Sequence, residues 1–558
     1  MPTMPDLPAQ AGRPLERPSP RPRGDWDAWG SEPARLPAAA KAIVATLLPG
    51  KAHPVARRQG PVLTPSRLTD ADLGALAAVV GAENATRDDG VRRLHLGGKS
   101  TPDLLRRRLD EVQQAPDAVI SPADHAEVAA VLCACDGLGI AVVPFGGGTS
   151  VVGGVEPARG SHRSVIALDL SRTAALLALD DVSLLATLGA GTTGPQAEEL
   201  LGARGFTLGH FPQSFQYASL GGYAATRSSG QASRGYGRFD DLVHALRVAT
   251  PVGDLELGRS PASAAGPDLR QLFLGSEGAF GVLTEVTVRI RPVPAATVYR
   301  AWSFPDFAAG TSAFREATQR GIRPTVLRLS DETETRVNAA MGGHLTRLRG
   351  CLAVATFEGP SVREAETVRD ALDGVFTAHG ATSRGEEPAR SWERGRFASP
   401  ALRDTLMDAG VLAETLETAT SWSGLDALKR SVTAALTASL SAAGAKPIVL
   451  CHISHVYPAG ASLYFTVVAA LTDDPQRQWA AAKDAASRAI GQAQGTITHH
   501  HAVGRDHRPY LEAEIGPLGV EVLRAVKGVL DPKGIMNPGA LVDAGAEPTE
   551  PAGPADRT

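Results

Sequence analysis

Between residues 115 and 294, apolar positions follow first a strand-like and then a helix-like spacing. A short apolar run at 117–122 predicts a strand, and residues 123–139 place apolar side chains at helical spacing before a closing glycine. Residues 140–150 predict a buried strand that runs into a glycine-rich loop. The order strand, helix, strand predicts a β-α-β unit.

The same stretch continues with further strands and one more helix. Residues 183–205 predict a strand, a turn and a helix with Pro195 near its first turn. Residues 245–258 predict two strands around a Pro-Val-Gly-Asp turn. In 279–294 apolar and charged residues alternate, which is typical of a strand with one buried face.

A second region begins near Ala295. The predicted elements are a helix after a loop at 303–321, a strand at 324–331, a strand and a helix at 351–381, a pair of strands at 447–472 and a helix at 477–495. This order suits an antiparallel sheet that helices cover on one face. A last helix and loop are predicted at 521–542.

Length and charge exclude several classes of protein. A chain of 558 residues is too long for one ordinary core and should form two or more packed units. The formal net charge of -4 offers no overall footprint for a polyanion, so we expect no nucleic-acid partner. No stretch approaches the roughly 18 uninterrupted apolar residues that a membrane-spanning helix requires.

Cysteine spacing and the chain ends favour a cytoplasmic protein. The cysteines at 133, 135, 351 and 451 match no zinc or dithiol spacing, and we expect them to be reduced. The proline-rich first 24 residues lack the apolar core of a signal peptide, and they and the tail at 543–558 are expected to be disordered. The C-terminal sequence is no peroxisomal address, which favours a bacterial cytoplasm.

Three glycine-rich stretches carry hydroxyl groups beside strands: Pro144–Gly154, His210–Gly237 and Gly275–Glu285. Glycine lets backbone N–H groups turn towards a phosphate, and Thr149 and Ser150 add hydroxyl donors. The first loop lacks the lysine of a Walker loop and the spacing of a Rossmann fingerprint. Alone, such a loop is more often a tight turn, but three such stretches in one region favour an anion cradle.

These stretches resemble the FAD domain of the vanillyl-alcohol oxidase type flavoproteins. The similarity consists of P-x-GGGTS, then H-x-P-x-S with S-x-GG and TR-x-SG, then GSEG-x-x-G-V-x-TE, in the same order along the chain. The resemblance implies an α+β fold, in which a two-subdomain FAD-binding domain (vanillyl-alcohol oxidase or PCMH type) carries a cap domain built on an antiparallel sheet with helices on one face.

The implied division has six parts. They are a disordered arm at 1–24, an N-terminal helical segment at 25–113, the FAD-binding domain at 114–294, the cap or substrate domain at 295–520, a C-terminal helix and loop returning to the FAD domain at 521–542, and the tail at 543–558.

Within that superfamily the chain is most similar to the alkyldihydroxyacetonephosphate synthase family, from about Trp26 to Leu541. The motifs are WDAWG at 26–30, RPTVLRLSD at 323–331, ALRDTLMDAGVLAETLE at 401–417, YPAGASLYFT at 457–466 and THHHAVG at 498–504. Distant relatives that oxidise 2-hydroxy acids typically show a single His-Gly in the last region, so the triple histidine distinguishes the two groups.

The resemblance implies a role for each matching residue. Tyr464 is the implied catalytic acid or base, with His210 and the histidines His499, His500 and His501 as further catalytic groups, and Arg403 and Arg328 as substrate-binding arginines. FAD, held non-covalently, would contact Pro144, Phe145, Gly146, Gly147, Gly148, Thr149, Ser150, Gln213, Ser214, Phe215, Gln216, Tyr217, Ala218, Ser219, Thr226, Arg227, Ser228, Ser229, Glu277, Gly278, Ala279, Phe280, Gly281, Val282 and Leu283.

The implied reaction exchanges the acyl group of acyl-dihydroxyacetone phosphate for a long-chain fatty alcohol. These two lipids are the implied partners, together with peripheral contact with a membrane surface and a homodimeric assembly. The alternatives from a different class of protein are an FAD-linked oxidase or dehydrogenase of a 2-hydroxy acid, such as D-lactate or glycolate, and a flavoprotein that binds without turnover.

Each of these residues also has a more common structural or metal-binding explanation. An arginine is more often a surface or salt-bridge residue, and Tyr464 in an alternating strand is more often a core aromatic. His499 and His501 with His507 could ligate a metal, but no Cys, Asp or Glu stands at a recognised spacing, so we predict no metal. A tyrosine needs nearby positive charge or hydrogen-bond donors to ionise at neutral pH, and we expect two or three of the imidazoles to provide them.

Overall fold

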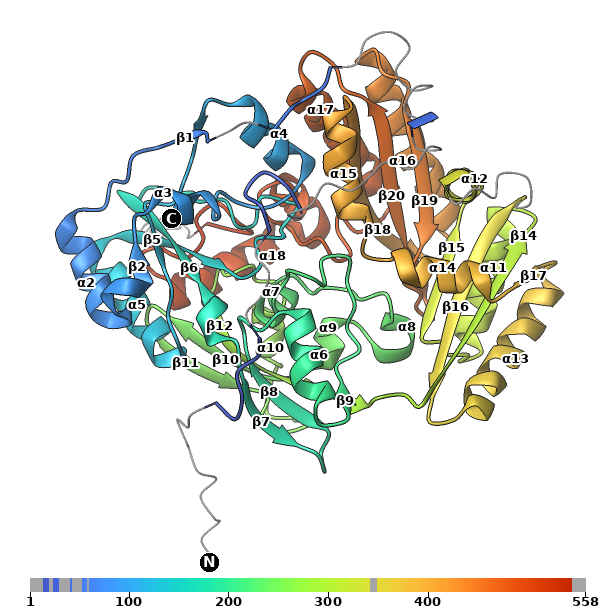
Figure 1. Ribbon diagram of the computed structural model, residues 1–558, viewed down its shortest axis with the longest axis horizontal. Helices are drawn as coiled ribbons and strands as arrows, with labels where there is room; N and C mark the ends of the chain where they lie inside the picture. The colour runs from blue at the N-terminus through green and yellow to red at the C-terminus, as the bar shows by residue number, and fades with distance from the viewer. Residues whose placement is uncertain are drawn as a thin grey trace, which may run out of the picture.

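The computed structural model describes residues 14–19, 24–29, 41–42, 53–57, 60–341 and 349–543. Figure 1 shows two parts side by side: a blue-to-green part with two small sheets, and a yellow-to-orange part built on one large sheet. Most of the predicted arm and the predicted tail lie outside the described residues. Among the described residues, no helix combines the length and apolar run that a bilayer crossing needs.

The first small sheet contains the predicted β-α-β unit. Its order is β2-β4-β6-β5, with β5 and β6 parallel. The strands are β2 (Ala85–Thr86), β4 (Ala118–Ile120), β5 (Ile140–Phe145) and β6 (Ser164–Asp169), and the crossover helix is α5 (His125–Leu138). α5 begins at the N-cap Asp124 and ends at Gly139, which adopts φ 64°.

The second small sheet is antiparallel, in the order β11-β10-β12-β8-β7. Its strands are β7 (Leu176–Asp180), β8 (Leu185–Gly189), β10 (Val243–Thr250), β11 (Gly253–Leu257) and β12 (Val282–Arg289), and helices α6 (Gly194–Gly202) and α7 (Leu220–Ala225) cover it. Residues 14–19, predicted as disordered, instead run along the edge strand β7, where Leu176 N–H donates to the Glu16 carbonyl at 2.9 Å. The open edge of a sheet offers unpaired backbone groups to such a segment.

The large sheet has seven strands in the order β17-β14-β16-β15-β19-β20-β18, and all pairs along it are antiparallel. The strands are β14 (Ala296–Phe304), β15 (Val326–Ser330), β16 (Cys351–Gly359), β17 (Thr382–Gly385), β18 (Val411–Ser421), β19 (Ile448–Ile453) and β20 (Gly460–Ala470). The α+β class with an antiparallel cap sheet is therefore confirmed.

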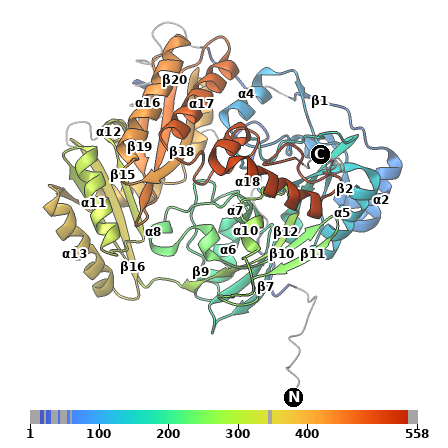
Figure 2. The same cartoon turned by 180° about the vertical axis from the view of Figure 1, so that it is seen from behind.

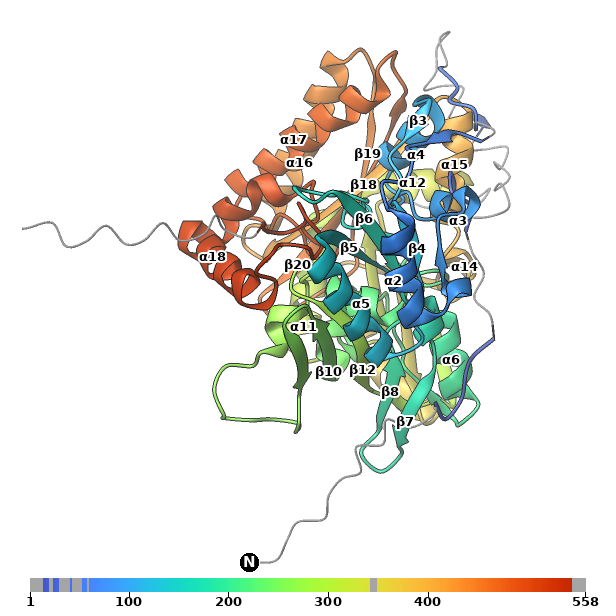
Figure 3. The same cartoon turned by 90° about the vertical axis from the view of Figure 1, so that its left-hand side faces the viewer.

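Most helices of the large part share one apolar core on one face of the sheet. They are α11 (Phe307–Gln319), α13 (Val362–Ala378), α16 (Leu425–Ala442) and α17 (Pro475–Gln492). Two helices depart from the expected arrangement. The first, α14 (Glu387–Gly395), packs on the opposite face, where Ala389 meets Ala301 and Val354. In Figure 3, α16 and α17 stand on one side of β18–β20, and α14 and α15 (Ser399–Asp408) stand on the other.

The structure defines the local elements at three places. In the stretch predicted as a loop and a helix at 303–321, the helix begins at Phe307, after the N-cap Asp306, because Ser303 and Phe304 still pair with β16. Residues 411–421, for which no strand was predicted, form edge strand β18 after Gly410, whose φ is 81°. α18 (Arg508–Leu530) begins earlier than the predicted last helix and is kinked at Gly516, before Pro517.

The C-terminal segment joins the two parts. Figure 2 shows α18, in red, lying across the back of the molecule between the small sheets and α17. After α18, Val142 N–H in β5 donates to the carbonyl of Ile535, and Asn537 N–H donates to the carbonyl of Val142. The chain end therefore extends the parallel sheet from which the first glycine loop emerges.

Candidate active site

A row of polar side chains crosses one face of the large sheet. His452 and Tyr464 are paired across β19 and β20, and Glu417 faces Tyr464 from β18, so all three project to the same side. Both Arg328 Nη atoms lie 2.9 Å from ring nitrogens of His452. The His452 and Tyr464 rings stack at 4.8 Å between centroids. We call Arg328, His452, Tyr464 and Glu417 the polar row.

The histidine loop, residues 496–504, closes over one end of the polar row. The Glu417 carboxylate accepts hydrogen bonds from the backbone N–H groups of His499 at 2.6 Å, His500 at 3.1 Å and His501 at 2.9 Å, and from Thr498 Oγ1 at 2.7 Å. Its side chain is fully buried. Burial alone would raise the pKa of Glu417, but the charge of the histidines, in the states where they are protonated, and the hydrogen bonds from the loop amides hold this pKa well below its usual value. The carboxylate is therefore ionised.

The loop imidazoles lie against one another and against Tyr464. Ring centroids are 6.0 Å apart for Tyr464 and His500, 5.8 Å for Tyr464 and His501, and 4.7 Å for His500 and His501. Burial lowers the pKa of His499, His500 and His501 to about 4 each, although Glu417 acts in the opposite direction. At pH 7 all three rings are neutral.

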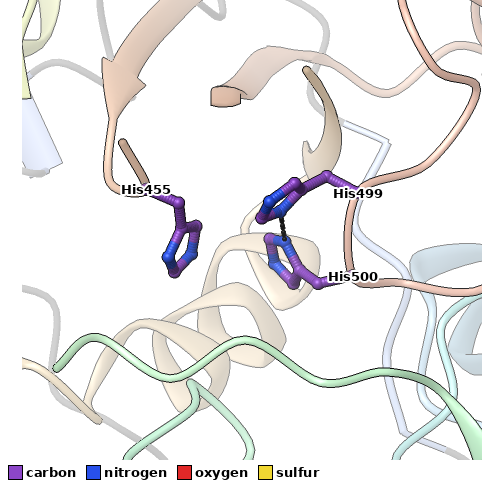
Figure 4. Close-up of side chains that lie close together, drawn as sticks. All are labelled: His455, His499 and His500. Carbon is purple, nitrogen blue, oxygen red and sulfur yellow. Dashed lines mark hydrogen bonds between the residues drawn. The ribbon is translucent and has the colours of Figure 1, made fainter. Parts of the chain in front are cut away.

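A fourth imidazole, His455, joins the cluster from the turn between β19 and β20. Its ring stacks on His499 at 5.0 Å and meets His500 at 5.4 Å (Figure 4). Its Nδ1 is 3.0 Å from Ser229 Oγ and 2.7 Å from Ser233 Oγ. His455 thus connects the predicted cofactor loop to the histidine loop. Sequence reasoning missed it; the signal was the second histidine of CHISH.

The neutral histidines bear on one expectation. We predicted that the imidazoles would help Tyr464 to ionise through positive charge or hydrogen-bond donation, and neutral rings leave only donation. Instead, burial raises the pKa of Tyr464 to about 12; Thr415 and Arg403 lower this pKa and the Glu414 and Glu417 carboxylates raise it. The cluster carries no positive charge that could offset desolvation. Tyr464 is therefore a neutral phenol that can donate a proton.

Arg403, on α15, is buried among groups from three distant segments. Its Nη1 donates to Glu414 Oε1 at 2.8 Å, its Nη2 donates to the Lys99 carbonyl, and its guanidinium lies 5.3 Å from the ring centroid of Trp29. Trp29 Nε1 donates to the same carbonyl at 2.9 Å. Among the described residues, Arg403 Nε has no hydrogen-bond partner. That buried donor can serve an incoming anion.

Two further predicted residues, Arg328 and His210, have hydrogen-bond partners of their own. Arg328 is already engaged, because its Nη2 also donates to Glu334 Oε1 at 2.7 Å. His210 is not part of the imidazole cluster: it packs against Tyr223 and Phe239, with centroids 4.7 and 4.9 Å away, and its Nε2 lies 3.1 Å from Ser228 Oγ. Burial lowers the pKa of His210 to about 3, so the ring is neutral.

The predicted cofactor loops meet in three dimensions. Gly146–Ser150 follow β5, Ser219 caps the N-terminus of α7, and Glu277–Gly281 precede β12. A Cβ on Gly146 would strike Ser219 Oγ, and one on Gly147 would strike the carbonyl of Tyr217. A Cβ on Gly278 would lie 2.8 Å from the Pro144 ring. Glycine is therefore required where the loops approach one another.

Backbone conformation in these loops suits an anion. Gly148, Arg227, Glu277 and Gly278 all have positive φ, between 51° and 75°. Such residues turn successive N–H groups towards one point and form a nest for phosphate oxygens. The close glycine contacts and this backbone fit the diphosphate of FAD, and the segments at 144–150, 213–219, 226–229 and 277–283 would hold it.

Glu277 connects this cradle to the histidine loop. Its Oε2 accepts from the N–H groups of Val503 at 3.1 Å and Gly504 at 2.7 Å, directly after the histidines. Asn537 Nδ2 donates to the Glu277 carbonyl at 2.7 Å. Burial raises the pKa of Glu277 to about 7, opposed by the two backbone hydrogen bonds. The cofactor loops and the polar row therefore belong to one site.

The structure also changes the metal alternative. Of the three histidines considered as ligands, only His499 belongs to the group that could hold an ion; the other members are His455 and His500. Their nearest ligand atoms all lie within 4.8 Å of one another, and His499 Nδ1 is 3.1 Å from His500 Nδ1 (Figure 4). The guanidinium of Arg238 lowers the pKa of His455, His499 and His500 and repels a cation in the same way.

Two family models match the chain. The model described as an FAD binding domain matches residues 116–257, and the model described as FAD linked oxidases, C-terminal domain, matches residues 293–541. The first contains the glycine loop after β5, and the second contains the polar row and the histidine loop. The cofactor is therefore FAD.

Two relatives and one solved structure cover most of the chain. The alkyldihydroxyacetonephosphate synthase of Trypanosoma brucei brucei is 34% identical over 483 residues, which are 82% of this chain and 78% of that protein. A solved structure of an alkyldihydroxyacetonephosphate synthase has a TM-score of 0.78 at 27% identity and covers 91% of this chain and 94% of that one. A mitochondrial D-lactate dehydrogenase (cytochrome) of Arabidopsis thaliana is 28% identical over 432 residues, 75% of this chain and 72% of that protein.

Proposed function

Because the chain belongs to the alkyldihydroxyacetonephosphate synthase family, we propose that it exchanges the acyl group of acyl-dihydroxyacetone phosphate for a long-chain fatty alcohol. The products are alkyl-dihydroxyacetone phosphate and a fatty acid, and the exchange involves no net redox change. One observation carries the proposal: the neutral phenol of Tyr464 lies between His452 and the His500 and His501 rings, in a site that Glu277 joins to the FAD loops.

The residues present can perform the proton transfers of such an exchange. Bound in its reduced form, the flavin would supply an electron-rich centre that allows the acyl group to be replaced without net oxidation. Tyr464 Oη holds a proton at pH 7, and the neutral imidazoles of His500 and His501 can accept one beside it. A proton beside the substrate carbonyl would thus move between neutral groups in the transition state.

Arg403 is the proposed phosphate-binding group. A guanidinium offers several N–H donors in one plane and stays charged, which suits a phosphate. Its Nε is free of partners among the described residues, and its bond to Glu414 fixes the plane of the guanidinium. An incoming phosphate would be held beside Tyr464, whose pKa Arg403 already lowers.

The test is the exchange itself. We expect purified holoenzyme, incubated with palmitoyl-dihydroxyacetone phosphate and labelled hexadecanol, to incorporate label into the alkyl product. Release of palmitate without incorporation would instead indicate hydrolysis and contradict the proposal. The rival 2-hydroxy-acid oxidoreductase is tested in a parallel cuvette: D-lactate or glycolate added without oxygen should leave the flavin absorbance near 450 nm unchanged, and rapid bleaching would favour the rival.

Lipid substrates bear on where the protein acts. We propose peripheral attachment to a membrane surface from the cytoplasmic side, because both substrates carry long apolar chains, and a homodimeric assembly as implied by the family resemblance. Flotation with phosphatidylcholine vesicles tests the first proposal, and sedimentation equilibrium tests the second. Recovery of all protein in the vesicle-free fraction, or a monomer mass, would reject the respective proposal.

A further inference from the structure

Glu417 is the one buried carboxylate among the described residues that accepts hydrogen bonds from each of the three loop histidines. We propose that Glu417 is the positioning residue of the site: its ionised carboxylate folds the histidine loop and holds the His500 and His501 rings against Tyr464. The inference deepens the proposed function and rests on it for the reaction that the rings serve.

Hydrogen-bond geometry requires the ionised form of Glu417. Its Oε1 accepts from Thr498 Oγ1, His500 N–H and His501 N–H, and its Oε2 accepts from His499 N–H. All four partners are donors, so a protonated or amide side chain would turn its own hydrogens towards one of them. Three successive backbone N–H groups converging on one anion form a nest, and the anion here belongs to the protein itself.

Strand pairing explains why the Glu417 carboxylate lies beside Tyr464. Glu417 on β18 is directly opposite Tyr464 on β20, so the same pleat that presents the phenol presents the anchor of the loop. The amides bound to Glu417 belong to the residues whose rings lie 6.0 and 5.8 Å from the Tyr464 ring. The histidine loop and the Tyr464 phenol are therefore positioned by residues of two neighbouring strands, β18 and β20.

The charge of Glu417 also changes the pKa values of the loop histidines, which a purely structural role would not do. Glu417 raises the pKa of His499, His500 and His501 against burial. Burial, the rings' effect on one another, and the charges of Arg238, His452 and Lys483 lower these pKa values, and Glu414 raises that of His501. Without the Glu417 charge the histidine pKa values fall further. Activity that needs neutral imidazoles is lost as pH drops through those values, so its acid limb moves to lower pH.

The decisive variant is Glu417→Gln, with Glu417→Asp and Glu514→Gln beside it. Glu514 is a matched control because its exposed carboxylate also anchors this loop, accepting from Thr496 Oγ1 and from Ile497 N–H at 2.7 Å, away from the rings. We expect Glu417→Gln to lower kcat a hundredfold or more with normal FAD content, since a displacement of about 1 Å has that effect. Glu417→Asp, which keeps the charge, should recover part of the rate, and Glu514→Gln should stay within twofold of the parent.

Histidine titration, followed by NMR of the ¹⁵N-histidine-labelled holoenzyme, separates this inference from the proposed function. We expect Glu417→Gln to lower the pKa of at least two ring systems that Glu514→Gln leaves unchanged, with or without lipid exchange in the parent. If the parent fails to exchange lipids, the proposed function is rejected while the titration still decides the role of Glu417. Unshifted histidines with parental kcat in Glu417→Gln, or equal losses in Glu417→Gln and Glu514→Gln, would overturn the inference.

Discussion

Replacement of Tyr464 by phenylalanine tests the central group of the site. With a pKa of about 12, ionising Tyr464 at pH 7 spans five pH units, or roughly 7 kcal/mol at 1.36 kcal/mol per unit. An ordinary tyrosine would need only about 4 kcal/mol. A mechanism that begins from tyrosinate would therefore use about one molecule in 10⁵. We infer that the phenol works as a proton donor and is not ionised beforehand.

The variant should be catalytically impaired but folded. Loss of general acid-base catalysis is expected to lower kcat by about 10² to 10⁴. Loss of the hydroxyl and its hydrogen bond with Thr415 should lower the free energy of unfolding by only about 0.5–1.5 kcal/mol. Tyr299→Phe is the matched control. Tyr299 lies in the same sheet, on β14, and its hydroxyl donates to Glu393 at 2.6 Å. Burial likewise raises the pKa of Tyr299 to about 12.

The assay is incorporation of labelled hexadecanol at pH 6 to 9, with flavin content and urea unfolding measured in parallel. Tyr464 stays neutral and the loop histidines stay deprotonated throughout this range, while Glu277, with a pKa of about 7, titrates within it. We therefore expect kcat/KM of the parent to change by much less than tenfold per pH unit. A tenfold rise in rate per pH unit would show that tyrosinate is required and would refute the reasoning. Parental activity in Tyr464→Phe would refute it equally.

Three further outcomes follow from buried contacts. Gly147→Ala should purify with little FAD, because the added Cβ collides with the Tyr217 carbonyl; a parental ratio of absorbance at 450 to 280 nm would contradict this. Lys527→Met should lower the free energy of unfolding by about 3–5 kcal/mol, because it leaves the fully buried Asp531 carboxylate without its cation at 2.9 Å, and adding Asp531→Asn should restore part of that loss in urea titrations. Arg403→Lys should raise KM for acyl-dihydroxyacetone phosphate about tenfold or more with a smaller change in kcat, as one ammonium cannot replace two planar donors; an unchanged KM would reject the phosphate role.

Local pattern was sufficient for the cofactor half of the protein. Gly139 closing α5, Asp124 capping it, and the alternation of β12 are short-range signals, and the structure contains the corresponding elements. The glycine loops could be recognised because close backbone approach requires glycine whatever surrounds it. In the same way the triple histidine could be singled out by its composition alone.

Strand β18 shows where these short-range signals fail to predict an element. Its Glu414 and Glu417 are fully buried, yet a buried strand is expected to be apolar, so 411–421 carried no strand pattern. Only the pairing of β18 with β20 gives these carboxylates partners, Arg403 for one and the histidine loop for the other. The partner of Glu414 lies 11 residues away along the chain, and the His499 amide that binds Glu417 lies 82 residues away.

The sequence by itself predicted elements such as α5 and β12 and the glycine-rich loops, because turns, caps and periodicity act over a few neighbouring residues, and the family resemblance named the candidate reactive side chains. The tertiary structure alone decided the protonation states: burial keeps Tyr464 and the histidines neutral, and convergent amides keep Glu417 charged. It also brought His455 into the cluster and left His210 outside it. Desolvation and hydrogen bonding depend on what surrounds a group in space, and distant segments supply those surroundings.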